Sequence, residues 1–194
     1  DGNLARPLPG FDHISGLAFP ATAPTPAFDS SVALATRSLK DAEDNLGIEE
    51  ASFPVAHYHI SEFFRINPGS KLWVRFGITE ATLQTDMEQF QTQAGGEIRQ
   101  IGAFLTDEFA DTQVQALEAA ATTLQSQKKP CSFLLAANLA SHSTFTTLGD
   151  LPDLRALTSP RASVVIGEDA GADGAALATS EGNSITTLGA TLGA

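Results

Sequence analysis

The sequence lacks several features that would place it in a functional class. Its 194 residues include one cysteine, Cys131, so no disulfide can form within the chain and the fold does not depend on an oxidising compartment. No apolar run approaches the ~20 residues that span a bilayer. Basic residues are scarce: 11 Lys and Arg stand against 23 Asp and Glu, a net charge of −12. This negative charge opposes binding to nucleic acid and to anionic membrane surfaces.

Motifs of the common catalytic classes are also missing. The sequence contains no Cys-x-x-Cys, no His-Glu-x-x-His and no Gly-x-Ser-x-Gly. The glycine-rich segment 167–174 lacks both the dinucleotide spacing and the Lys-Ser/Thr of a P-loop, and its acidic residues would repel a pyrophosphate. As a calcium loop beginning at Asp169, it has Gly171 and Ser180 where two ligands are required. We expect this segment to be a mobile loop.

The chain does contain enough apolar residues, 42%, for a core of its own. Prolines recur through residues 1–31, which predicts an irregular N-terminal, arm-proximal segment, in which residues 13–19 are compatible with an extra edge strand. Residues 32–194 form the predicted α/β core domain. The chain begins at Asp1 without a signal segment and ends without a polar tail, so we expect a fragment that is truncated at the C-terminus.

Helical and strand patterns alternate along this domain. Ser38 and Gly47 suit the two ends of one helix, and an apolar stripe predicts a second helix from about Ser52, with Pro54 in its first turn, to residue 66. Strands are predicted at 32–36, 71–78, 98–105, 131–137 and 162–167, and further helices at 83–94, 114–124 and 151–157. The spacing is typical of βαβ units. It predicts an α/β fold, a mostly parallel sheet with helices on both faces.

Acidic and amide side chains follow three of these strands. They are Asp107 and Glu108, Asn138, and Glu168 with Asp169. Because an open parallel sheet binds ligands beyond the carboxyl ends of its strands, Asp107, Glu168 and Asp169 support one alternative, a metal-assisted hydrolase that uses Mg²⁺. We favour the simpler interpretation that these side chains solvate loop ends and cap helices. A third hypothesis, a module that binds a small molecule or peptide, requires an apolar pocket at the same ends of the strands.

Histidine and cysteine residues give weaker indications. His57 and His59 lie in the second predicted helix, where residues two apart point about 200° apart, so they cannot share a metal ion. His13 and His142 have no acidic residue at a ligand-like spacing. Cys131 begins a strand of buried character, which favours core packing over a reactive thiolate. We therefore assign no catalytic, cofactor-binding or metal-binding residue.

Five stretches of the sequence, in this order, resemble a branch of the contractile-tail sheath proteins of bacterial prophages and related mobile elements. They are DGNLARPLPGFDHISG (1–16), YHISEFFR (58–65), AGGEIRQIG (94–102), LPDLRAL (151–157) and VVIGED (164–169). The resemblance implies a structural protein whose copies stack in rings around an inner tail tube and contract. It also implies an α/β core and extended terminal arms that complete a sheet in the neighbouring subunit.

The expected function is therefore that of a virion structural protein and not of an enzyme. The resemblance implies no cofactor, and its expected partners are other copies of the chain and an inner tube protein, without nucleic acid, membrane or small-molecule substrate. It places the protein in the host cytoplasm during assembly and then in a phage tail or tail-like particle. A subunit that pairs with a neighbour's arm should present an exposed sheet edge or an apolar patch.

Overall fold

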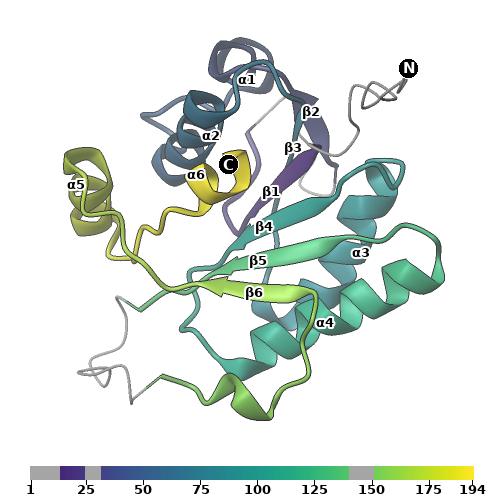
Figure 1. Ribbon diagram of the computed structural model, residues 1–194. Helices are drawn as coiled ribbons and strands as arrows, with labels where there is room; N and C mark the ends of the chain where they lie inside the picture. The colour runs from purple at the N-terminus through teal and green to yellow at the C-terminus, as the bar shows by residue number, and fades with distance from the viewer. Residues whose placement is uncertain (1–13, 25–31, 140–150) are drawn as a thin grey trace, which may run out of the picture.

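The structure of the chain, a computed structural model, describes residues 14–24, 32–139 and 151–194. One six-stranded sheet runs through it in the order β2-β3-β1-β4-β5-β6 (Figure 1). All neighbouring strands are parallel except β2 and β3. The bounds of the strands are β1 Ser15–Phe19, β2 Leu34–Thr36, β3 Leu72–Phe76, β4 Gln100–Phe104, β5 Ser132–Ala136 and β6 Ala162–Val165. The predicted mostly parallel sheet is confirmed.

Helices pack on both faces of this sheet, as predicted, and each face has its own apolar core. The helices α1 (Leu39–Leu46), α2 (Pro54–Ile66) and α6 (Leu188–Gly193) cover one face, and α3 (Leu83–Gln93) and α4 (Asp111–Ser126) cover the other. Helix α5 (Ala172–Glu181) projects from the end of the sheet (Figure 1). Two 3₁₀ turns occupy Glu80–Thr82 and Leu154–Ala156. In the described residues, none of the helices combines the length and apolar composition that crossing a bilayer requires.

Local sequence signals account for the first two helices. The Ser38 hydroxyl accepts a hydrogen bond from the Asp41 amide at 3.0 Å, and Gly47 adopts a φ of 70°, which closes α1 at its C-terminus as predicted. Helix α2 begins at Pro54, two residues later than the first predicted position, because proline is suited to the first helical position and fixes φ there.

Strand β1 is central in the sheet, so the prediction of an edge strand at 13–19 is wrong. It pairs with β3 on one side and β4 on the other, and all five of its residues are buried. A strand that is buried on both faces shows no polar alternation, which explains its weak pattern. Gly16 also has no room for a side chain, because an added Cβ would lie 2.9 Å from the Phe90 ring. A strand of the core sheet thus lies within the segment 1–31.

The C-terminal quarter contains more helix than predicted. The expected loop at 167–174 ends at Gly171, and α5 begins at the next residue. The Asp169 side chain accepts a hydrogen bond from the Gly171 amide at 2.8 Å, which orders the turn into α5, and the alanines that follow favour helix. Helix α6 was not predicted. The helix predicted at 151–157 is only the 3₁₀ turn Leu154–Ala156. His13 and His142 lie outside the described residues.

Candidate functional site

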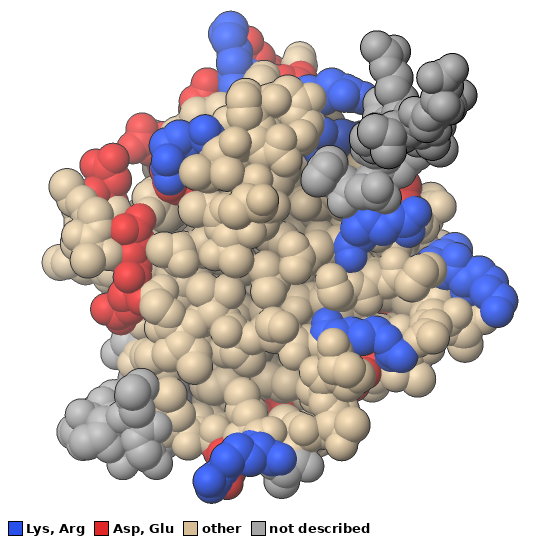
Figure 2. Space-filling view, in the orientation of Figure 1, with Lys and Arg blue, Asp and Glu red and all other residues tan. Residues whose placement is uncertain are grey.

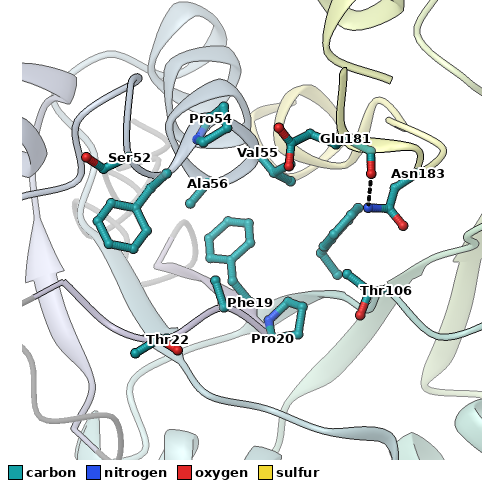
Figure 3. A pocket seen from close by; sticks show the side chains of 13 residues that line it. Phe19, Pro20, Thr22, Ser52, Pro54, Val55, Ala56, Thr106, Glu181 and Asn183 are labelled. Atoms are coloured by element: carbon teal, nitrogen blue, oxygen red, sulfur yellow. Dashed lines mark hydrogen bonds between the residues drawn. The ribbon is translucent and has the colours of Figure 1, made fainter. Parts of the chain in front are cut away.

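A pocket of about 380 Å³ opens at the carboxyl ends of β1 and β4 (Figure 3). From β1 the chain passes through α2 to β3, which lies on one side of β1 in the sheet. It then passes through α3 to β4, which lies on the other side of β1. The chain that leaves β1 continues to α2 on one face of the sheet, and the chain that leaves β4 continues to α4 on the opposite face, so the two connections diverge at the carboxyl ends of these strands. This reversal of strand order is the place at which open α/β sheets bind ligands.

Four short segments line this pocket, which we call the switch-point pocket. They are the end of β1 with its following loop (19–22), the start of α2 with the two residues before it (52–56), the end of β4 and the residues after it (Phe104 and Thr106), and the end of α5 with the residues after it (Glu181 and Asn183). The walls are mostly apolar, and three phenylalanine rings from different elements contribute to them. Sequence analysis missed the pocket because its residues are apolar and far apart in the chain. Their positions directly after β1 and β4 were the available signal.

The first turn of α2 lines the pocket and begins with backbone amides that lack acceptors among the described residues. No side chain caps this helix, and its first backbone hydrogen bond runs from the His57 amide to the Phe53 carbonyl at 2.9 Å. Pro54 has no N–H, so the first amides of the helix belong to Val55 and Ala56. Neither amide has an acceptor among the described residues. The helix dipole adds partial positive charge at this point.

Asn138 ties the far rim of the pocket to the sheet. Its side-chain amide donates to the Thr106 carbonyl at 2.7 Å and to the Asn183 side chain at 3.1 Å, and its oxygen accepts from the Ser184 amide at 3.1 Å. The side chain is buried, and these bonds replace the hydrogen bonds to water that its polar atoms lose on burial. This predicted candidate is therefore a structural link between β5, β4 and the chain after α5.

Glu168 and Asp169 point away from each other. The backbone here is extended and bridges to Thr186, and consecutive residues of an extended chain project to opposite sides. Glu168 accepts from the Ser184 hydroxyl at 3.0 Å, whereas Asp169 accepts from the Tyr58 hydroxyl on α2. Asp107 is exposed. Across residues 14–24, 32–139 and 151–194, no group of three or more His, Cys, Asp or Glu side chains could hold a metal ion.

The two histidines of α2 have different neighbours, in agreement with the helical prediction. His57 Nε2 lies 2.8 Å from the Glu43 carboxylate on α1. The His59 ring packs between Phe19 and Phe104, with ring centroids at 6.2 and 5.7 Å, on the inner side of the pocket wall. Cys131 is buried, and burial raises the pKa of its thiol to about 12, although the nearby Arg99 charge opposes this. Such a thiol is not a nucleophile at neutral pH.

His59 should make the fold sensitive to acid. The side chain is fully buried, neither ring nitrogen has a hydrogen-bond partner, and burial lowers the pKa of the imidazole to about 4. Because the unfolded chain takes up this proton near pH 6.5, stability is lost as the pH falls from about 6.5 to 4, by about 3 kcal/mol. His59→Phe should remove this loss. Urea unfolding of both proteins at pH 7, 5.5 and 4.5 tests this, and parallel pH profiles would contradict it.

Comparisons with protein-family models and with curated proteins found no match for this chain.

Proposed function

We propose that this chain is a structural subunit of a contractile, phage-tail-like sheath that polymerises around an inner tube. The proposal begins from the resemblance of five stretches of the sequence to that family. The observation that carries it is the outer edge of β6, which is unpaired in the part of the chain that the structure describes and suits pairing with a strand from a neighbouring copy. The carboxylates of the alternative hydrolase are bonded instead to Ser184 and Tyr58, so no observation favours that function.

The edge of β6 is open to a further strand. In the described residues β6 pairs only with β5. The Phe133 amide bonds the Arg161 carbonyl at 2.8 Å, and the Ala137 amide bonds the Val165 carbonyl at 3.0 Å, so alternate residues from 161 to 165 face β5. In a parallel ladder the residues between them direct their N–H and C=O groups outward. Ala162 and Val164 therefore present a row of backbone donors and acceptors.

Most of the usual protection against pairing is missing from this edge, although Pro160 and Arg161 stand directly before β6 and the strand has only 4 residues. Proteins commonly block a free edge with a charged residue, a proline or a bulge. The four residues of β6, Ala-Ser-Val-Val, include none of these residue types, and Ile166 just beyond them is 36% exposed. An edge of this kind favours association through backbone hydrogen bonds, the mode that the resemblance implies.

The surface beside this edge is free of charge. Strands β4, β5 and β6 and helix α6 contain no charged residue. Figure 2 shows the side of the molecule on which α6 and β6 lie, with Lys, Arg, Asp and Glu gathered around its margin and a broad uncharged middle. The centres of protein interfaces are depleted of charged residues in the same way. For a chain of net charge −12, such a face limits repulsion between copies.

The proposed partners are other copies of the chain, in rings, and an inner tube protein. Assembly of this kind places the protein in the host cytoplasm first and in a tail or tail-like particle afterwards. It requires no reacting side chain, because the affinity comes from the backbone and the apolar surface.

Electron microscopy of the full natural chain tests the proposal. Negative-stain images at high protein concentration should show rings or tubes. Val164→Pro removes one outward N–H from β6 while leaving the bonds to β5 in place, so it should abolish the polymers without unfolding the monomer. Val164→Ile keeps the N–H and is the matched control, which should assemble as the natural chain does. A natural chain that stays monomeric, or a proline variant that polymerises normally, would contradict the proposal.

A further inference from the structure

We propose that the switch-point pocket binds a small neutral molecule that has one apolar ring and one carbonyl or amide oxygen. Nothing in the assembly of a structural subunit requires such a ligand, so this site goes beyond the proposed function. The inference depends on the apolar walls of the pocket, on the donors at its helical end and on the charge at its rim.

The walls of the pocket suit an apolar ring and are already formed. Its volume of about 380 Å³ falls within the range of small-molecule sites. Phe19 and Phe104 are almost fully buried in the sheet, which holds their rings in place. Phe76 packs against Phe19 at 5.6 Å and edge-on against Phe53 at 5.7 Å, and thus supports the opposite wall. Phe53 is half-buried and supplies the accessible part of the aromatic wall, so a ligand ring can pack against it without first ordering the site.

The start of α2 supplies hydrogen-bond donors beside this apolar space. Val55 and Ala56 line the pocket, and their backbone amides have no acceptor among the described residues. Helix α2 is 13 residues long, and the first N–H groups of a helix of this length bind oxygen atoms readily. Ser52 and Thr22 also line the pocket, and Figure 3 places Ser52 beside the start of α2 and Thr22 across the pocket near Pro20. A ligand that places an oxygen acceptor at the start of α2 satisfies groups that the protein itself leaves unpaired.

The charge at the rim selects a neutral acceptor. Glu181 lines the pocket near Val55 (Figure 3), and none of the lining residues that the structure describes is Lys or Arg. A carboxylate ligand would be repelled by Glu181 and by the net charge of −12, whereas a carbonyl or amide oxygen would not. The rim is held in position, because the Asn183 side chain donates to the Glu181 carbonyl at 3.1 Å and receives the bond from Asn138.

Benzamide is a suitable probe, with benzoate as its charged counterpart of nearly the same shape. Saturation-transfer difference NMR observes the probe, so it works with the full chain whether that chain is monomeric or polymerised. Benzamide should bind with a dissociation constant of about 1 mM, as expected for so few atoms. Benzoate should bind at least ~10-fold more weakly, and Glu181→Gln should reduce this difference.

Two variants locate the binding. Thr106 is exposed at the mouth of the pocket, so Thr106→Phe should fill the mouth and weaken benzamide binding at least ~10-fold. Thr85→Phe places the same ring at an exposed position on α3, on the opposite face of the sheet, and should change nothing. Absence of benzamide binding at about 10 mM, equal binding of benzoate, or unchanged binding by the Thr106 variant would each overturn the inference. None of these results depends on polymerisation, which is tested separately.

Discussion

Replacement of Asp86 by alanine is expected to destabilise the fold by about 3–5 kcal/mol, because it removes a carboxylate that pairs with the buried guanidinium of Arg75. Arg75 projects from β3 towards α3, and its side chain is 3% exposed. Its Nη2 lies 2.9 Å from the Asp86 carboxylate and 3.1 Å from the Gln89 side chain. The Thr82 hydroxyl also donates to Asp86, at 2.6 Å. Urea unfolding of the variant measures the loss directly.

An exposed ion pair provides the control for this experiment. Lys40 and Asp44 on α1 lie 2.7 Å apart with both side chains largely in water, so Asp44→Ala should change stability by less than ~1 kcal/mol. The double variant Arg75→Met, Asp86→Leu removes both buried charges and should recover much of the stability that Asp86→Ala loses. If Asp86→Ala behaved like Asp44→Ala, the buried pair would not have the role that its geometry assigns to it.

Replacement of Gly189 by alanine is expected to destabilise the protein by about 3 kcal/mol through a clash between two helices. An added Cβ on Gly189 in α6 would fall well within van der Waals contact of the His59 backbone carbonyl in α2. Because both groups are attached directly to helical backbone, neither can rotate away, and α6 would have to move as a unit. That movement would expose Leu188 and Leu192, which α6 buries against the sheet.

Gly167→Ala is the matched control for the Gly189 variant. Gly167 has no atom within 4 Å of an added Cβ, so its substitution should be nearly neutral. Urea unfolding should separate the two variants, and limited proteolysis should cut near residues 188–194 first in the Gly189 variant. Equal stability of the two variants would show that α6 does not pack closely on α2.

Interactions between residues close in sequence were the most predictable part of this fold. The Ser38 cap, the Gly47 turn and the apolar stripe of α2 each act within one or two helical turns, so the sequence contains both partners of each interaction. Strands β3, β4 and β5 were predictable because each is a short, mainly apolar run between helical patterns, and the run at β5 is continuous. For the same reason the α/β class followed from the regular spacing of these elements.

The order of the strands could not be predicted in the same way. β1 lies at the centre and β6 at the edge, although the apolar run at 162–167 looks more deeply buried than the mixed run at 13–19. Apolar content does not specify which neighbour a strand pairs with. That choice depends on contacts between residues far apart in the chain, such as Gly16 against Phe90 and Gly102 against Leu192.

The candidate sites show the same difference between local features, which the sequence predicts, and long-range contacts, which it does not. The sequence alone determined the α/β class, the strand ends that carry Asn138, Glu168 and Asp169, and the helical phase that separates His57 from His59, because each depends on backbone periodicity within a short stretch. It did not determine what those side chains contact. The links from Asn138 to Asn183 and from Asp169 to Tyr58 form only when the chain after β6 folds back over the sheet. The switch-point pocket, and the edge that β6 leaves unpaired among the described residues, likewise depend on which segments become neighbours in space.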